Sequence, residues 1–296
     1  MTLEETFTLA NGVDIPKLGL GTWRIADADA ARVVLDAVAI GYRHLDTAQA
    51  YANERGVGEG LRASEVPRDQ VFVTTKLAAE CKSYAEASQR IDGSLRMLGL
   101  DHVDLMLIHS PQPWAEFREG EHFFEGNLEA WRALEEAYRA GKLRAIGVSN
   151  FERADLDNLL DNGSVKPMVN QILAHVGATP FDLIDYTRSR GLLVEAYSPV
   201  AHGALLHDAD LSALAETYRV SVAQLCIRYC LQLGLLPLPK TANAAHMRTN
   251  AEVDFVISDA DMERLKGARG DIDYGAASAF PVFGKPRQID NAAAKR

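Results

Sequence analysis

Over most of its length the chain alternates short apolar runs with longer amphipathic ones, and this alternation constrains the fold more than any other feature. Eight apolar runs of four to seven residues are bounded by polar or turn residues, as expected of strands buried on both faces. The predicted strands are Lys17–Gly21, Tyr42–Asp46, Gln70–Lys76, Val103–His109, Leu143–Ser149, Met168–Gln171, Leu193–Tyr197 and Leu235–Pro239. Eight strands with intervening helices predict an α/β fold, a closed parallel (β/α)8 TIM barrel, with an open doubly wound sheet as the alternative.

Two segments add to this pattern. Phe7–Pro16 contains Asn11-Gly12 between short apolar pieces, which predicts a β-hairpin that plugs the bottom of the barrel. The long connection Ser110–Gly126 predicts a loop on the face where barrel active sites lie, and long loops are often functional. The 296 residues suit one barrel without a linker or repeat, so we predict a single domain over 1–296. Its core covers about 7–265, and the C-terminal loop and tail cover 266–296, irregular after Asp273.

Charge and composition exclude several classes of function. The net charge of −10 argues against a nucleic acid partner, because phosphate backbones attract basic surfaces. No apolar run approaches the roughly 18 residues of a membrane helix, and no signal peptide precedes the barrel, so we expect no membrane partner and a cytoplasmic location. We expect Cys81, Cys226 and Cys230 as packed side chains, and no Cys/His cluster has the spacing of a metal site.

Polar residues stand at or just after the ends of three adjacent predicted strands: Asp46, Lys76 and His109, with Tyr51 in the segment after Asp46. Singly, each has a plain explanation: a helix cap, a solvated lysine, a core histidine and a packing tyrosine. Together they would face one mouth of the barrel, where barrel enzymes carry their chemistry. Four such groups therefore predict an active site.

These four side chains suit the reduction of a carbonyl group, which needs a hydride at carbon and a proton at oxygen. A tyrosine hydroxyl titrates at about 10, and a nearby lysine ammonium favours the phenolate, so we expect Lys76 to make Tyr51 a stronger acid. Asp46 would hold Lys76 charged and in place. His109 would donate a hydrogen bond to the carbonyl oxygen and stabilise developing negative charge there.

At this point the sequence resembles a known family, the aldo-keto reductases. The longest matching motif is Gly41–Gly58, and the others are Leu18–Trp23, Asp104–Pro111, Ile146–Phe151, Ala196–Pro199 and Leu238–Thr241. These six motifs occur in the family's order, and the resemblance runs from about Phe7 to Leu265. In general appearance the chain resembles the bacterial diketogluconate reductase-like subgroup.

The resemblance implies an NADPH-dependent carbonyl reductase in which Asp46, Tyr51, Lys76 and His109 form the catalytic tetrad. The hydride would come from C4 of the nicotinamide and the proton from Tyr51. The implied cofactor-binding residues are Thr22, Asp46, Ser149, Asn150, Gln171, Tyr197, Ser198, Val200, Lys240, Thr241, His246 and Asn250. Among them, Ser149, Asn150 and Gln171 would hold the carboxamide, while Tyr197 would stack on the nicotinamide ring. From the residues alone, Ser149-Asn150 could instead cap a helix over Phe151–Leu160.

A glycine-rich run, Gly56-Val-Gly-Glu-Gly60, resembles a dinucleotide loop but does not follow a strand as that fingerprint requires. We interpret these glycines as permitting close packing at the start of a helix.

The chain departs from the family pattern around the 2′-phosphate of NADPH. Lys240 and Thr241 match the pattern, but His246 stands where an arginine is common. A neutral histidine is a weaker phosphate partner than the charged fork of a guanidinium. We therefore expect a moderate preference for NADPH, with NADH also possible. Arg248 either reaches inward and restores part of this preference or faces solvent.

The substrate pocket departs from the family as well. Ser110 stands where a tryptophan often follows the catalytic histidine, which removes a usual pocket wall. The predicted substrate residues are Trp23, Tyr51, His109, Ser110 and Trp114. The other loop aromatics Phe117, Phe123 and Phe124 could line the pocket or fasten the loop, and the tail aromatics Tyr274, Phe280 and Phe283 could close the pocket from another side.

Two other functions remain open at the level of sequence. Lys76 could form a Schiff base with a carbonyl substrate in a lyase, or the barrel could bind a cofactor as a sensor without turnover. The cofactor motifs at the fifth to eighth predicted strands do not fit the lyase, and the intact set of four residues argues against the sensor. By resemblance to the family, the protein would be a monomer or a loose dimer that acts on a small-molecule carbonyl substrate.

Overall fold

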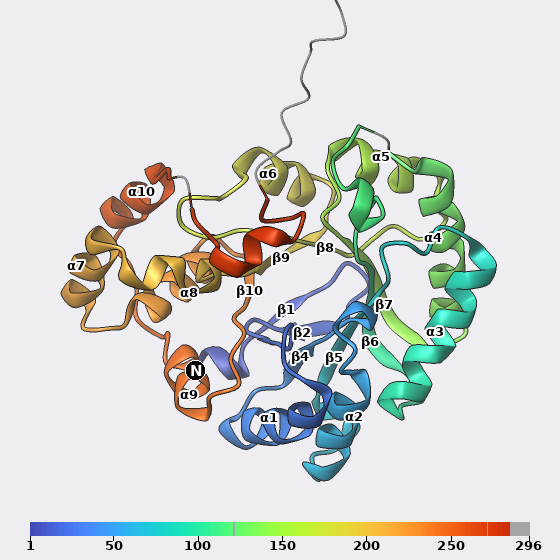
Figure 1. Cartoon of the computed structure of the whole chain (residues 1–296), viewed down its shortest axis with the longest axis horizontal. Coiled ribbons are helices and arrows are strands. Elements are labelled where there is room, and N and C mark those ends of the chain that lie inside the picture. The colour runs from blue at the N-terminus through green and yellow to red at the C-terminus, as the bar shows by residue number, and fades with distance from the viewer. Residues whose placement is uncertain (121, 271, 285–296) are drawn as a thin grey trace, which may run out of the picture.

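The computed structural model describes residues 1–120, 122–270 and 272–284 and contains a barrel of eight parallel strands surrounded by helices (Figure 1). The barrel strands are β3 (Leu20–Gly21), β4 (His44–Asp46), β5 (Phe72–Leu77), β6 (Val103–Ile108), β7 (Leu143–Ser149), β8 (Val169–Leu173), β9 (Leu193–Tyr197) and β10 (Leu236–Leu238). Every predicted strand is present, with ends that differ by up to three residues. The barrel closes where Gly21 pairs in parallel with Lys240, so the closed fold is confirmed and the open sheet is wrong.

Helices connect successive strands on the outside of the barrel. The α-helices are α1 (Asp27–Ile40), α2 (Glu54–Ala63), α3 (Tyr84–Leu98), α4 (Phe124–Arg139), α5 (Arg153–Asn162), α6 (Phe181–Ser189), α7 (Ala209–Tyr218), α8 (Val222–Gln232), α9 (Ala244–Ala251) and α10 (Asp259–Gly267). The 3-10 helices are η1 (Thr2–Glu4), η2 (Gln49–Tyr51), η3 (Arg68–Gln70), η4 (Trp114–Glu116), η5 (Ala201–His207) and η6 (Gly275–Ala279). Local signals start some of these helices: Ser221 and Gln224 form the capping box that begins α8.

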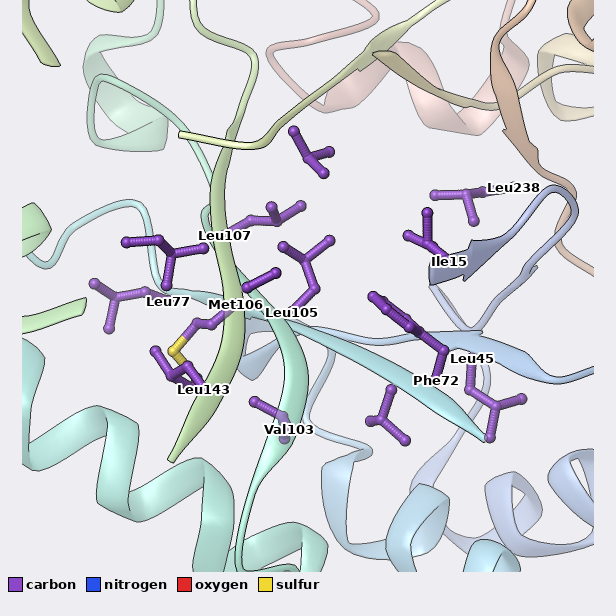
Figure 2. Packing of buried hydrophobic residues seen from close by; sticks show 14 of the residues in the cluster. Ile15, Leu45, Phe72, Leu77, Val103, Leu105, Met106, Leu107, Leu143 and Leu238 are labelled. Carbon is purple, nitrogen blue, oxygen red and sulfur yellow. The ribbon is translucent and has the colours of Figure 1, made fainter. Parts of the chain in front are cut away.

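The predicted N-terminal hairpin is present as antiparallel strands β1 (Thr6–Thr8) and β2 (Asp14–Pro16). Its turn uses Gly12 at a φ of +84°, which a glycine adopts without strain. Ile15 is fully buried and belongs to the same cluster as Leu45, Phe72 and Leu238 (Figure 2). Since Phe72 begins β5, the hairpin covers the amino-terminal end of the barrel, opposite the ends that carry the predicted site.

The core is built from strands buried on both faces. Every residue of β5 and β6 is buried, because one face meets the barrel interior and the other meets the helices. Figure 2 shows Leu77, Met106 and Leu143 of three successive strands within this core. Burial of each large apolar side chain stabilises the fold by about 1.5–3 kcal/mol, so the barrel provides a rigid frame for the loops at its carboxyl end.

The glycines of α2 allow this helix to lie unusually close to its neighbours. A Cβ atom on Gly56 would lie 2.2 Å from the carbonyl oxygen of Asp27, and one on Gly58 would lie 1.9 Å from that of Leu98. These approaches are impossible for any larger residue. The glycine-rich run therefore serves packing of α2 against its neighbours, as the sequence indicated.

The C-terminal segment differs from expectation in one respect: Gly275–Ala279 forms a short 3-10 helix where irregular structure was predicted. Figure 1 shows this segment in red near β9. The predicted tail over 285–296 lies outside the described residues. All three cysteines are buried free thiols, as predicted. Within the described ranges, no helix is long and apolar enough to cross a membrane, and no group of acidic, histidine or cysteine side chains could hold a metal ion.

Candidate active site

A cleft of about 1290 Å³ opens at the carboxyl end of the barrel and contains most of the predicted site residues. This volume exceeds the ~300–1,000 Å³ of a typical small-ligand pocket, so the cleft can hold an extended dinucleotide together with a small substrate. The predicted residues that line it are Trp23, Asp46, Tyr51, His109, Trp114, Ser149, Asn150, Gln171, Tyr197, Ser198, Val200, Lys240, Thr241, His246 and Asn250. Thr22, Lys76 and Ser110 do not line it.

Lys76 lies beneath the floor of the cleft and joins two of the other tetrad residues. Its ammonium donates to Asp46 Oδ1 at 2.6 Å, to the Thr47 carbonyl oxygen at 2.9 Å and to the Tyr51 hydroxyl at 3.4 Å. The side chain is fully buried at the end of β5. Burial alone would lower the pKa of Lys76, but the Asp46 carboxylate and the hydrogen bonds to Asp46 and Tyr51 outweigh it and raise the pKa. Lys76 is therefore a fixed positive charge next to Tyr51.

This environment corrects the expectation that Tyr51 is a stronger acid than free tyrosine. Burial raises the pKa of Tyr51, and the nearby Lys76 ammonium offsets only part of that rise. Tyr51 therefore stays protonated at neutral pH, which is the state that a proton donor needs. If that proton were to leave, the Lys76 ammonium would stabilise the resulting phenolate.

His109 lies beside Tyr51, with ring centroids 5.6 Å apart. Burial and the positive charge of Lys76 hold the pKa of His109 well below its usual value, so the imidazole is neutral. Its Nδ1 atom is buried and has no hydrogen-bond partner among the described residues. A neutral imidazole has one N–H to donate, and His109 lines the cleft, where a carbonyl oxygen could accept that hydrogen bond.

The same geometry excludes Lys76 as a Schiff-base nucleophile. Its ammonium is fully buried, is held by three oxygen atoms and has a raised pKa, so no free amine reaches the cleft. A nucleophilic lysine needs a lowered pKa and access to substrate. The lyase alternative is therefore wrong.

An amide-lined end of the cleft lies next to the tetrad. Asn150 donates to the carbonyl oxygen of His109 at 3.0 Å and accepts from the Tyr197 hydroxyl at 2.7 Å. Asn150 has a φ of +63°, a conformation that asparagine tolerates better than most residues. The alternative of a helix cap is wrong, because α5 is capped by Glu152 and not by Ser149 or Asn150. Asn150 also donates to the Ser149 hydroxyl at 3.0 Å, and both side chains line the cleft instead of the start of α5.

Cationic groups lie further along the cleft. Arg24 and Lys240 both line it, and partial burial together with the Arg24 guanidinium lowers the pKa of Lys240. Two cations that line one cleft favour an anion there. His246 and Asn250 line the same cleft, whereas Arg248 is exposed and does not contribute to its lining. The structure thus places Arg248 toward solvent.

Two predicted ligand residues are turned away from the cleft. The Thr22 hydroxyl is buried and donates to the carbonyl oxygen of Asp46 at 2.9 Å. Ser110 is also fully buried, where its hydroxyl accepts from Gln112 N and its carbonyl oxygen accepts from the Lys82 ammonium at 3.0 Å. Thr22 and Ser110 therefore support the strand ends, and the structure does not bring them to a ligand.

Aromatic side chains replace the wall that Ser110 does not provide. The ring of Trp114 lies edge-on to His109, with centroids 5.1 Å apart, and Phe117 packs behind it at 5.6 Å. On another side of the cleft, the rings of Trp23 and Phe280 pack together with their centroids 4.9 Å apart. Of the loop aromatics, only Trp114 lines the cleft; Phe117 is buried behind it, whereas Phe124 is exposed.

The tail aromatics also line the cleft, as the sequence suggested. Phe283 lies 4.4 Å from His202 and 5.0 Å from Tyr274 between ring centroids. Tyr274 is anchored by a hydrogen bond of 2.9 Å between its hydroxyl and His175 Nε2. The C-terminal segment therefore forms one wall of the cleft and is tied to the barrel by a buried histidine.

Comparison with known proteins agrees with this geometry. Residues 17–269 match the model of the Aldo/keto reductase family. A glyoxal reductase of Bacillus subtilis is 39% identical over 276 residues, which covers 93% of this chain and 96% of that protein. The chain belongs to the aldo/keto reductase family. The predicted family, the barrel, and nicotinamide-dependent reduction of aldehydes or ketones are thereby confirmed.

Solved structures support the same assignment. An aldo-keto reductase of Bombyx mori, crystallised in complex with NADP, superposes with a TM-score of 0.84 at 30% identity and covers 95% of this chain and 99% of its own. An aldo/keto reductase of Brucella melitensis superposes with a TM-score of 0.83 at 36% identity, and the match covers 89% of this chain and 98% of that one. None of these names identifies a subgroup, so the resemblance to diketogluconate reductases stays a prediction.

Sequence reasoning missed two charged residues of this aldo-keto reductase. Arg24 follows the predicted wall residue Trp23, and its cationic side chain lines the cleft although no sequence motif marks it. Glu195 is a fully buried acid in β9, the strand next to β8, which carries Gln171. A signal for Glu195 was present, because a carboxylate in the middle of the apolar run Leu193–Tyr197 is costly unless something pairs with it.

Proposed function

We propose that this aldo-keto reductase reduces aldehydes and ketones with NADPH as the preferred cofactor and Tyr51 as the proton donor. The observation that carries the proposal is the Lys76 ammonium, which lies between the Asp46 carboxylate and the Tyr51 hydroxyl at the floor of the cleft. The bound reduced nicotinamide supplies a hydride to the carbonyl carbon. Everything else in the reaction falls to residues of this chain.

Tyr51 gives its proton to the carbonyl oxygen as negative charge develops there. The phenolate left behind faces the Lys76 ammonium, which lies 3.4 Å from the hydroxyl in the resting state. Asp46 keeps that ammonium charged and in place. His109, being neutral, donates a hydrogen bond to the same carbonyl oxygen and orients it, which is a preorganised arrangement for oxyanion stabilisation.

The residues of the cleft fit a nicotinamide dinucleotide. Ser149, Asn150 and Gln171 offer hydroxyl and amide groups for a carboxamide, and the Tyr197 ring offers a face for the nicotinamide. Arg24 and Lys240 would hold the pyrophosphate and the 2′-phosphate region. Since His246 rather than an arginine lines the adenosine end, we propose a moderate preference for NADPH and acceptance of NADH.

The substrate end favours small, flat, apolar carbonyl compounds. Its walls are aromatic: Trp114 beside His109, and Trp23 with Phe280 opposite. Aromatic walls gain more from a flat apolar group than from a strongly hydrated one. The Bacillus subtilis relative is named a glyoxal reductase, so glyoxal belongs in the substrate panel beside aromatic aldehydes. We propose that the whole chain works as one cytoplasmic domain, as a monomer or loose dimer.

The proposal is tested by fluorescence titration with NADPH and NADH, followed by a 340 nm assay on aldehydes and ketones. We expect tight NADPH binding, weaker NADH binding and oxidation of the cofactor by at least one aromatic aldehyde. The Tyr51→Phe variant should bind NADPH and lose turnover. Failure of the wild-type protein to bind either nucleotide would overturn the proposal.

A further inference from the structure

Glu195 is a buried acid that the proposed chemistry does not use. It lies in β9, is fully buried and does not line the cleft. Its Oε2 atom accepts a hydrogen bond from Gln171 Nε2 at 2.7 Å, while its Oε1 atom has no partner among the described residues. Burial and the negative charge of Asp46 raise the pKa of Glu195 to about 8.

Stability alone does not account for an acid at this position. A buried polar atom without a partner costs free energy, and an apolar side chain in β9 would avoid that cost. The neighbouring strand residues Val194 and Ala196 are both apolar and buried. The hydrogen-bond partner of this carboxyl group is Gln171, which directs attention to that amide.

Glu195 and Asp46 together hold the amide of Gln171 in one orientation. The Gln171 amide nitrogen carries two hydrogens, one donated to Asp46 Oδ2 at 2.9 Å and the other to Glu195 Oε2 at 2.7 Å. The reverse orientation would set the amide carbonyl oxygen against the Asp46 carboxylate, which is ion-paired with Lys76. Only the carbonyl oxygen of Gln171 is then left for a ligand in the cleft, which Gln171 lines.

We propose that Glu195 is a positioning residue that fixes the Gln171 amide so that its carbonyl oxygen accepts from the carboxamide NH₂ of the bound nicotinamide. This inference rests on the proposed function, because it concerns how that cofactor is held. With Asp46 as the only acceptor, the amide could rotate about its single remaining hydrogen bond. Glu195 supplies the second acceptor and removes this freedom before the cofactor binds, so less ordering is required on binding.

The test compares two ligands at pH 7: NADPH, and adenosine 2′,5′-bisphosphate, which lacks the nicotinamide. Glu195→Leu removes the oxygen that accepts from the Gln171 amide, whereas Glu195→Gln keeps a carbonyl oxygen that can accept this hydrogen bond. We expect Glu195→Leu to raise the Kd for NADPH roughly threefold to tenfold, the value of one lost hydrogen bond, and to leave the Kd for the bisphosphate unchanged. Glu195→Gln should restore NADPH binding to within about twofold of wild type on the same reasoning. If the leucine variant does not fold, Glu195→Met takes its place.

Two controls separate positioning from general damage. Glu54 is another buried glutamate, bound to the Thr75 hydroxyl at 2.6 Å and outside the cleft lining, so Glu54→Leu should leave both Kd values unchanged. In a Gln171→Leu background, Glu195→Leu should add less than about twofold, because its effect passes through the Gln171 amide. In turnover, Glu195→Leu should raise the KM for NADPH more than it lowers kcat.

The outcomes distinguish this inference from the proposed function. A wild-type protein that does not bind NADPH overturns both. A wild-type protein that binds NADPH, with a leucine variant that binds it equally well or loses both ligands alike, overturns the role of Glu195 and leaves the reductase intact. An effect of Glu195→Leu that persists undiminished without Gln171 also overturns it.

Discussion

The free energy of unfolding of this protein, measured relative to that of its Glu195→Gln variant, should fall as the pH rises from 5 to 8. In the fold the pKa of Glu195 is about 8, against about 4.5 for an ordinary glutamate. The folded protein therefore holds this proton more tightly than the unfolded chain does. The contribution to stability is fully present below pH 4.5 and is lost as the pH rises toward 8.

The size of the effect follows from the difference between the two pKa values. Each pH unit between them costs about 1.4 kcal/mol of unfolding free energy, so the interval from pH 5 to pH 8 costs about 3 kcal/mol as an order of magnitude. The amide of glutamine has the shape of the neutral acid and does not ionise. At pH 5 the two proteins should therefore be nearly equal, and at pH 8 Glu195→Gln should be the more stable by about that amount.

Urea unfolding at pH 5, 6, 7 and 8, followed by circular dichroism and by tryptophan fluorescence, measures this difference. Exposed Glu216→Gln provides the matched control, since it removes one carboxylate without changing a buried group. Other buried acids and histidines titrate in both proteins and cancel in the comparison. Parallel stability curves for wild type and Glu195→Gln would refute the reasoning, because they would mean that Glu195 ionises as freely in the fold as in water.

Three further predictions concern activity. Tyr51→Phe should lower kcat by about 100- to 10,000-fold at unchanged NADPH affinity, measured by 340 nm assay and fluorescence titration, and a variant as fast as wild type would rule out Tyr51 as the proton donor. Trp114→Ala should lower kcat/KM for benzaldehyde about tenfold, a loss of ~1.4 kcal/mol, and change that for glyoxal much less; equal losses on both would argue against an aromatic wall. His246→Arg should raise the ratio of NADPH to NADH affinity by about 10- to 100-fold, the value of a charged hydrogen bond, and this gain should shrink with added salt. An unchanged ratio would place His246 away from the 2′-phosphate.

The grouping of the four proposed catalytic residues was predictable because three of them stand at or beside strand ends and Tyr51 follows shortly after one. Asp46 and His109 stand at or directly after the ends of β4 and β6, Lys76 lies near the end of β5, and a parallel barrel brings those ends to one mouth. Neither the position of the strand ends nor their meeting at one mouth has to be inferred from side-chain contacts. The same reasoning identified Trp114 and the tail aromatics as candidates, since long loops at that face have few other places to lie.

Predictions that depended on the direction of a side chain failed for Ser110 and Thr22, which do not line the cleft. Ser110 follows His109 directly, but its side chain turns into the protein, and Trp114 forms the wall from four residues later. Thr22 is likewise buried against the Asp46 carbonyl oxygen. Sequence separation does not report side-chain direction in a loop, where no period of two or of 3.6 applies.

What the sequence determined by itself is the order of strands and helices, the closed barrel that they imply, and the four residues that we propose as the catalytic groups. Local periodicity and strand ends carry that information along the chain. Only the tertiary structure decided the electrostatics: that burial outweighs Lys76 in setting the pKa of Tyr51, and that Asp46 and Glu195 share the amide of Gln171. Desolvation and paired acceptors depend on groups far apart in sequence, 125 residues in the case of Gln171 and Asp46, so they exist only once the barrel has closed.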